Sequence, residues 1–332
     1  MLVIRRAGGL LAAALVLLLV CLLSVWLGAK PISPDVTWHA LWQNDGSPEA
    51  TIIQQYRVPR TLIGILAGIG LGVAGVLMQA MTRNPLADPG LLGVTLGASA
   101  AVVAAIAFAG VSALTGYVWF ALAGAAAAAV LVYLLGRGGR SAAAADRMVL
   151  AGAAISAVLA AFVSAVLLQR PDVFLTFRYW DVGSIAGRDM AVVVQVAPFI
   201  VVGTVIALLL ARPLNVLALG DETGRALGVA TVRTRLWAAI AVTLLCGAAT
   251  AAAGPIGFVG LIIAHSTRLL AGPDLRWSLP YAALLSPVLL LGADLVGRLI
   301  AAPSELAVGL VTALIGAPIF IAVCRRRRLA EL

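Results

Sequence analysis

The chain has 332 residues, of which 62% are hydrophobic and only 11% are charged. A soluble domain carries about a quarter charged residues, so this composition excludes an ordinary soluble protein and favours one that lies mostly in lipid. The net charge of +9 would suit a nucleic-acid partner, but the distribution of that charge along the chain gives it a different explanation.

Ten apolar segments approach the roughly 20 residues that a helix needs to cross a bilayer. The eighth is the least typical, because it is short and contains His265, Ser266 and Arg268. The predicted spans are 10–29, 61–81, 91–110, 113–135, 147–169, 191–211, 236–253, 256–271, 280–300 and 306–324. They leave little room for a soluble domain. We therefore expect an all-α polytopic membrane protein with one transmembrane domain over residues 1–332.

The first segment, 10–29, has two interpretations. A cleaved signal peptide has an apolar core of about 7–15 residues followed by an A-x-A site. The apolar run here is longer and no such site follows it. This favours an uncleaved first membrane helix.

The second segment repeats small residues, with Gly64, Gly68 and Gly72 spaced four apart. Small residues at this spacing let the backbones of neighbouring helices approach closely. The pattern predicts a helix packed in the interior of the bundle. It says nothing about a substrate.

The turn TRNPLADPGLLG (82–93) follows the second span. Its two prolines exclude a continuous helix, and Asp88 is well placed to cap the next helix. The turn is either a plain connection or part of the inner mouth of a pathway.

The segment LNVLALGDETGRALGV (214–229) is a polar insert between two apolar spans. We expect Pro213 to end the sixth span, and two short helices to lie on the membrane surface, the second capped by Asp221 and ended by Gly228. A helix that rests on lipid alone is usually rich in Lys and Arg on its polar face. This segment has two acids and one arginine, which favours a protein partner.

The basic residues are unevenly divided between the two sides of the predicted topology. With the N-terminus inside, sixteen lie on the inner side: Arg5, Arg6, Arg83, Arg137, Arg140, Arg147, Arg212, Arg225, Arg233, Arg235, Arg268, Arg276 and Arg325 to Arg328. Seven lie on the outer side: Lys30, Arg57, Arg60, Arg170, Arg178, Arg188 and Arg298. This positive-inside bias explains the basicity without a nucleic acid and predicts that both termini are cytoplasmic.

The sequence also limits how transport could be driven. Lys30 is the single lysine and it is not part of a P-loop, so the chain cannot itself hold ATP in that way. Either an ion gradient or a separate ATPase must supply the energy. Asp294 is the one deep acid, and Arg298 four residues later can pair with it. An acid held in a structural ion pair gives little evidence for a proton relay. A separate ATPase is therefore favoured over an ion gradient as the energy source. The dispersed cysteines and histidines predict neither a metal centre nor a disulfide framework.

At this point the chain resembles a known family. Five segments occur in the order found in permease subunits of bacterial ABC importers for ferric siderophores, haem and vitamin B12. They are RVPRTLIGILAGIGLGVAGVLMQAMTRNPLADPGLLGV (57–94), the 214–229 segment, GPIGFVGLIIAHSTRLLAGPD (254–274), ADLVGRLI (293–300) and LAVGLVTALIGAPIF (306–320). These permeases are the FecCD or BtuCD type, and the resemblance covers essentially the whole chain. Within the family, four segments are most similar to the ferric enterobactin branch: RPDV (170–173), RYWDVGS (178–184), VTLLCGAATAAAGPIGFVG (242–260) and RWSLP (276–280).

The resemblance implies a type II importer fold of ten helices, paired with a second permease subunit as a homodimer or heterodimer in the bacterial inner membrane. Two cytoplasmic ATPase subunits, which hold the ATP and Mg²⁺, and an extracytoplasmic substrate-binding protein would complete the assembly. The chain itself would be no enzyme and would bind no cofactor.

The resemblance also implies roles for particular residues. The inner gate would include Asn84 and Leu86. Arginines at the outer face would dock the binding protein, namely Arg57, Arg60 and Arg298. The ATPase would contact the coupling segment, through Leu219, Asp221, Glu222, Arg225, Leu227 and Gly228. One departure from the family pattern is Ala264, where a proline is usual, and it favours a packing role for the neighbouring His265.

Two alternatives remain open from the sequence. One is a secondary transporter that works alone on an ion gradient. The other keeps the importer but changes the cargo to haem or vitamin B12.

Overall fold

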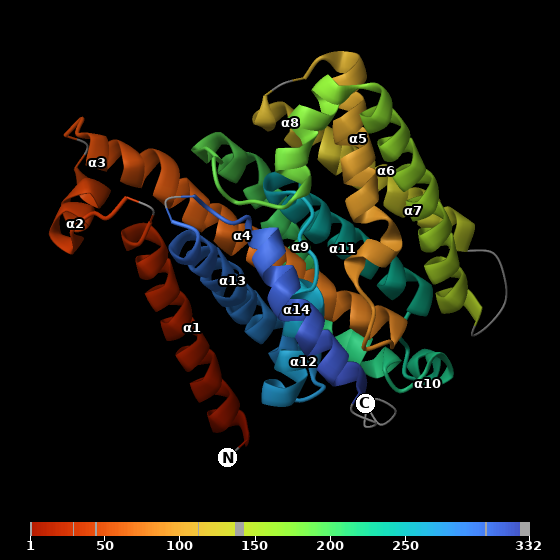
Figure 1. Ribbon diagram of the computed structural model, residues 1–332. Helices are drawn as coiled ribbons and strands as arrows, with labels where there is room; N and C mark the ends of the chain where they lie inside the picture. The colour runs from red at the N-terminus through yellow and green to blue at the C-terminus, as the bar shows by residue number, and fades with distance from the viewer. Residues whose placement is uncertain are drawn as a thin grey trace.

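The computed structural model describes residues 2–28, 30–43, 45–111, 113–136, 143–302 and 304–325. Within these ranges the chain forms helices and turns, with no β-strand (Figure 1). The ten longest helices are α1 (Leu2–Trp26), α4 (Val58–Thr82), α5 (Val94–Ala109), α6 (Leu114–Gly136), α7 (Ala143–Gln169), α9 (Met190–Leu217), α11 (Thr231–Ala253), α12 (Val259–Ala271), α13 (Leu275–Ile300) and α14 (Val308–Arg325). The shorter ones are α2 (Pro34–Trp42), α3 (Pro48–Thr51), the π-helical η1 (Ile52–Arg57), the 3₁₀-helical η2 (Pro89–Leu92), α8 (Pro171–Asp181) and α10 (Asp221–Ala226).

Each of the ten predicted spans corresponds to one of these ten long helices, so the predicted all-α polytopic fold is confirmed. Seven helical segments are long and apolar enough to cross a membrane. The three shorter apolar helices are α5, α12 and α14, and α12 is the segment whose sequence is least typical of a span.

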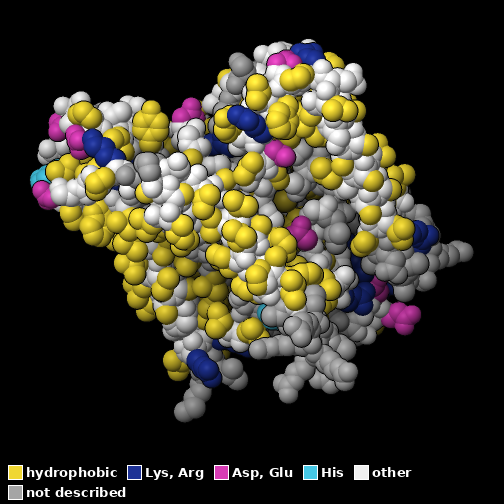
Figure 2. All heavy atoms as spheres, in the orientation of Figure 1, with side chains coloured by type: hydrophobic (Ala, Val, Ile, Leu, Met, Phe, Trp, Pro, Cys, Tyr) yellow, Lys and Arg dark blue, Asp and Glu magenta, His cyan; other side chains and the backbone are white. Residues whose placement is uncertain are grey.

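Helix α4 lies in the middle of the bundle and packs against α9, α11, α12 and α13. Helices α1 and α7, by contrast, lie at its edges and expose most of their side chains. The start of α1, the end of α14 and α10 lie at one end of the bundle, here called the α10 end. Helices α2, α3 and α8 lie at the other, the α8 end (Figure 1). Figure 2 shows mostly hydrophobic side chains between the two ends, with charged side chains concentrated at them, as expected for a lipid-facing belt.

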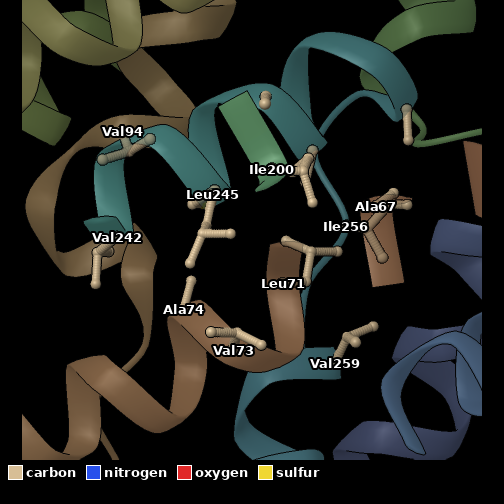
Figure 3. Close-up of a cluster of buried hydrophobic side chains, with 14 of the residues drawn as sticks. Ala67, Leu71, Val73, Ala74, Val94, Ile200, Val242, Leu245, Ile256 and Val259 are labelled. Carbon is tan, nitrogen blue, oxygen red and sulfur yellow. The ribbon is translucent and has the colours of Figure 1, made fainter. Parts of the chain in front are cut away.

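The part of the core in Figure 3 is built largely from alanine and branched aliphatic side chains of α4, α9 and α11. Leu71 and Ala74 of α4 face Leu245 of α11 and Ile200 of α9. All four are at most 6% exposed. Because lipid tails are as apolar as these side chains, close packing rather than burial from water holds such helices together.

The glycine repeat of α4 lets α13 pack closely against it, as expected for an interior helix. A Cβ atom on Gly68 would lie 2.6 Å from the Cα of Pro287 in α13, and one on Gly72 would lie 2.4 Å from the Cβ of Ser286. Further along, a Cβ on Gly75 would lie 2.5 Å from the Cα of Gly260 in α12. Two glycines therefore meet where α4 and α12 cross.

The segment between α8 and α9 passes through a narrow gap between the end of α11 and the start of α14. Ser184 N donates to Ala253 O at 2.7 Å, and Gly309 N donates to Gly183 O at 2.9 Å. A Cβ on Gly254 would lie 2.0 Å from the carbonyl oxygen of Trp180, so only glycine fits there. These contacts fix the loop that carries Arg188 at the α8 end.

Three local predictions are wrong. Pro213 does not end a helix: α9 continues through it to Leu217, because Leu214 and Leu217 are buried and stabilise the last turn. The first of the two short helices predicted in 214–229 is therefore the end of α9, and α10 is the one short helix there. Asp221 is not an N-cap either. Gly220, at φ +114°, holds that position, and the Asp221 carboxylate binds two arginines instead.

Two other local predictions fare differently. Asp88 does cap a helix, by accepting from Gly90 N at 2.8 Å, but that helix is η2 rather than α5. Gly228 follows the end of α10 with φ +81°, as predicted. Of the basic residues assigned to the inner side, Arg137, Arg140 and Arg326 to Arg328 lie outside the described residues.

The α4–α12 crossing gives a first prediction. Gly75→Ala should destabilise the protein by about 1–3 kcal/mol, because the added methyl group meets the Gly260 backbone and cannot be accommodated by a side-chain rotation. Thermal unfolding of the detergent-purified protein measures this.

Gly292→Ala is the matched control, since no atom lies within 4 Å of its added methyl group. It should unfold at the same temperature as the unmodified protein or higher. Equal unfolding temperatures for the two variants would contradict the proposed crossing.

Candidate functional site

The three arginines predicted to dock a partner meet at the α8 end in what we call the arginine cluster: Arg57, Arg60 and Arg298 with Asp294 and Glu305. All three arginines are at most 8% exposed, and Asp294 is 1% exposed. The sequence predicted their common position at one end of the bundle. It did not predict that they would be buried.

Asp294 is the centre of this cluster. Arg60 of α4 binds it with two nitrogens, Nε to Oδ2 at 3.0 Å and Nη2 to Oδ1 at 2.7 Å. Arg298, one turn further along α13, lies 2.8 Å from Oδ2, so the predicted i, i+4 pair forms. The remaining Nη1 of Arg60 donates to Glu305 at 2.7 Å. Two-nitrogen contacts of this kind are the strongest ion pairs available to arginine.

Arg57 and Arg298 also cap the end of α1. A helix leaves its last carbonyl groups without partners, and cationic side chains there are favoured by the helix dipole. Arg57 donates to the carbonyl groups of Val25 and Trp26, and Arg298 donates to those of Ser24 and Leu27. The arginines therefore fasten α1 to η1, directly before α4, and to α13.

A hollow of about 280 Å³ opens beside the cluster. Its lining includes Lys30, Tyr56, Arg57, Arg60, Arg298 and Glu305. The guanidinium groups of these arginines are bound to other groups of the chain, but they also line a hollow that an acidic side chain of another protein could enter. The predicted docking role stays a prediction.

The coupling segment lies at the opposite end of the bundle, as α10 and the turns on either side of it. Asp221 Oδ1 accepts from Arg83, just after α4, and from Arg235 of α11 at 2.9 Å. The packing of α10 on α9 is close, because a Cβ on Gly224 would lie 2.6 Å from Leu217. One carboxylate thus links α10 to two central helices.

The outward side of this segment combines apolar and charged residues. Leu219 is 68% exposed and Leu227 is 62% exposed. Glu222 and Arg225 are exposed beside them, and the structure gives the Glu222 side chain no ion pair among the residues it describes. Exposed leucines next to unpaired charge are typical of a protein-binding surface. Gly228, at the end of this surface, is also exposed.

A second link joins the end of α9 to the start of α13. Asn215 Nδ2 donates to Asp274 Oδ1 at 2.6 Å, and Leu275 N donates to Asn215 Oδ1 at 3.0 Å. Arg276 binds the same carboxylate, and these bonds together lower the pKa of Asp274 to about 2. Asp274 is therefore ionised at any physiological pH. No sequence pattern indicated this contact, because its partners lie 59 residues apart.

The predicted gate residues lie in the turn after α4. Asn84 Oδ1 accepts from Leu86 N at 2.9 Å, which closes a tight turn, and the Leu86 side chain is 39% exposed. The preceding residue, Arg83, has φ +54°, a backbone conformation that costs a side chain energy and that residues other than Gly and Asn rarely adopt. Its ion pair to Asp221 helps to hold it there. The turn and α10 are thus directly connected.

The described residues contain no group of three or more His, Cys, Asp or Glu side chains that could hold a metal ion. The chemistry at both ends of the bundle is that of ion pairs and apolar contacts.

Comparison with known proteins gives a consistent result. The model of the FecCD transport family matches residues 16–326. The ferric enterobactin transport system permease protein FepD of Escherichia coli is 44% identical, over 98% of this chain and 97% of its own length. The hemin transport system permease protein HmuU of Yersinia pestis is 37% identical, over 89% and 85%. The solved structure of a metal-chelate type ABC transporter in an inward-facing conformation superposes with a TM-score of 0.85 at 28% identity, over 96% of this chain and 99% of its own.

The arginine cluster gives a second prediction. Asp294→Asn should lower the free energy of unfolding by about 3–5 kcal/mol, because it leaves the buried Arg298 without a counter-ion and Arg60 with only Glu305. Chemical or thermal unfolding in detergent measures the change.

Glu305→Gln removes the other carboxylate bound to Arg60 and serves as the control. The Glu305 side chain is 34% exposed, so water replaces the lost bond and the cost should be about 1 kcal/mol or less. If the two variants are equally stable, Asp294 is not the centre of the cluster.

Proposed function

The chain belongs to the FecCD transport family, and from that membership we propose that its cargo is a ferric siderophore. The protein is the permease subunit of an ABC importer and not an enzyme. The observation that carries the proposal is the match to such permeases over almost the whole chain. Several relatives are named for other iron compounds, ferric citrate and hemin among them, so the cargo is the part that most needs a test.

We propose that the chain forms one transmembrane domain in the inner membrane, paired with a second permease subunit, either a copy of itself or a paralogue. Two ATPase subunits, holding ATP and Mg²⁺, would lie beneath the α10 end. A binding protein would deliver the cargo to the α8 end. The positive-inside bias supports this orientation, which makes both termini cytoplasmic.

The exposed side of α10 fits the ATPase-docking role. Leu219 and Leu227 would fill an apolar groove on the ATPase, while Glu222 and Arg225 would fix the orientation. Gly228 lets the chain turn directly from this surface towards α11. These residues face outward and have few contacts within the chain, as a docking surface requires.

Asp221 has a different part in this proposal. Its carboxylate faces inward and binds Arg83 and Arg235, so it would transmit the movement of α10 rather than contact the ATPase. Because Arg83 adjoins the turn that holds Asn84 and Leu86, pulling on α10 would also move that turn. This is the simplest route by which ATP binding could open or close an inner gate.

At the α8 end, the hollow beside the arginine cluster would receive acidic side chains of the binding protein. Arg57 and Arg60 would contribute most, because the Arg298 side chain is only 2% exposed. The rim residues Lys30 and Tyr56 would widen the contact. Opposite charges on the two proteins would mainly speed their association.

A gradient-driven carrier working alone is the competing proposal. It would need an acid in the membrane that can release and take up protons. Asp294 is the candidate, but both of its carboxylate oxygens are bound by arginines, which is the arrangement of a structural ion pair. This favours the ATP-driven alternative.

The coupling proposal predicts different effects for two variants, one on ATPase binding and one on uptake. Leu227→Asp should prevent the ATPase from binding, because it puts a charge in an apolar contact. Asp221→Asn should leave ATPase binding intact but cut uptake at least tenfold, because the link to Arg83 and Arg235 is weakened. Co-purification of the ATPase measures the first effect, and uptake per molecule of ATP hydrolysed measures the second. Loss of ATPase binding in Asp221→Asn would show that Asp221 is itself a docking residue.

The cargo is tested by uptake of ⁵⁵Fe-labelled ferric enterobactin, ferric citrate and hemin in a strain that lacks this chain. Uptake of a ferric siderophore should be lost and restored by the gene. If only hemin uptake changes, the cargo is haem. In vesicles that contain this chain alone, accumulation driven by a pH or sodium difference would support the gradient-driven carrier and overturn the importer proposal.

A further inference from the structure

The α8 end contains a second and larger hollow, of about 420 Å³, next to the arginine cluster. It is bounded by α8, by the loop between α8 and α9, and by the residues just before α14. Its lining includes Arg60, Tyr117, Tyr179, Trp180, Arg188 and Glu305. Arg60 and Glu305 also line the smaller hollow, so the two are neighbours. We call the larger one the outer cavity.

Arg188 is the unusual residue of this cavity. It is only 6% exposed, yet the structure gives it no hydrogen bond and no ion pair with any described residue. Its neighbour Asp189 does not pair with it; that carboxylate instead caps α9 by accepting from Val192 N at 3.1 Å.

The other cationic residues described at this end all have partners. Lys30 binds Glu49, Arg170 binds Asp172 and Arg178 binds Tyr179. The three arginines of the cluster are paired as described above. Arg188 therefore stands apart from every described cation around it.

Burying a charged group without a partner is costly, and proteins avoid it unless the charge is used. Burial lowers the pKa of Arg188 to about 10, but at neutral pH the guanidinium still carries its charge. Trp180 lines the same cavity, and its Nε1–H also lacks an acceptor within the described part of the chain. The nearby acid Glu305 already accepts from Arg60. The described lining thus holds two donors without partners, and its one carboxylate, that of Glu305, is already paired with Arg60.

We propose that Arg188 is the anion-binding residue of the outer cavity and takes a negatively charged oxygen, such as a carboxylate, from a molecule that enters from the α8 end. Trp180 Nε1 would donate a second hydrogen bond, and the rings of Tyr117 and Tyr179 would line the sides. This assignment rests on the proposed function in one respect only, namely that the α8 end faces the outside of the membrane. Two sources carry this chemistry: the anionic chelate that is transported, and an acidic side chain of the binding protein that delivers it.

Charge-selective labelling tests the site without any assumption about the cargo. Cys21, Cys246 and Cys324 are first replaced by serine, and Ser184→Cys places a thiol in the cavity lining. The rate of its reaction with an anionic sulfonatoethyl thiosulfonate is compared with that of a cationic trimethylammonioethyl one. Arg188→Gln should lower the anionic-to-cationic ratio roughly three- to tenfold, and Arg188→Lys should preserve it. An unchanged ratio in Arg188→Gln would overturn the proposal.

Whether the anion comes from the chelate or from the binding protein is tested in the complete assembly, by measuring which of them protects the Ser184→Cys thiol from labelling. If the loaded and the unloaded binding protein both protect it, and Arg188→Gln weakens both effects, an acidic side chain of that protein is bound. If only the loaded protein or free ferric citrate protects it in an Arg188-dependent way, the chelate is bound. Protection that is identical with and without the Arg188→Gln substitution would overturn the assignment, whatever the protein transports.

A stability measurement separates ligand binding from a structural role. Arg188→Gln should unfold at the same temperature as the unmodified protein or higher, because it removes an unpaired buried charge. Arg60→Gln, the matched control, should unfold at a lower temperature, because it breaks bonds to Asp294 and Glu305. If Arg188→Gln unfolds as early as Arg60→Gln, Arg188 is a structural residue and the proposal fails.

Discussion

The pairing of Asp294 with Arg60 and Arg298 fixes the α8 end of the protein. Ions are expensive to remove from water, so a buried carboxylate between two arginines requires all three groups to stay in place. Through them α4 and α13 share one fixed point, and Arg298 extends it to α1. Arg60 forms part of the lining of both outer hollows, and Arg298 lines the smaller one. Structure and surface charge at this end therefore depend on the same few bonds.

Helix α13 connects the two ends of the bundle. At its start, Asp274 binds Asn215 at the end of α9, next to the coupling segment. Near its finish, Asp294 and Arg298 belong to the arginine cluster. Although Pro280 and Pro287 lie inside it, α13 runs unbroken between these two contacts, so a displacement near α10 would be transmitted along it to the outer hollows. This gives the proposed two-state motion a continuous physical connection.

Much of the fold could be predicted because it follows from local pattern: apolar length indicated the ten helices, and the spacing of Gly64, Gly68 and Gly72 indicated the close packing of α4. The errors arose where tertiary contacts override local rules. Pro213 sits inside α9 because Leu214 and Leu217 are buried, and Asp221 leaves the capping position for two arginines. The Asp294–Arg298 pair followed from its spacing, but the carbonyl groups of α1 that Arg57 and Arg298 bind were not predictable, because main-chain acceptors leave no trace in a sequence. Arg188 is conspicuous only once the structure shows that no described residue pairs with it.

The attachment of α1 has a consequence for biosynthesis. Its main packing partner is α13, and the carbonyl oxygen of Ser24 accepts from an arginine made 274 residues later. During translation α1 therefore reaches the bilayer long before the helix that will hold it. Until then it is held by its own affinity for lipid and by contacts with the segment that follows it, such as the Arg57 cap. Its mean hydropathy of 2.7, the highest of the seven long spans, fits a helix that stays in the bilayer until α13 has been synthesised and inserted.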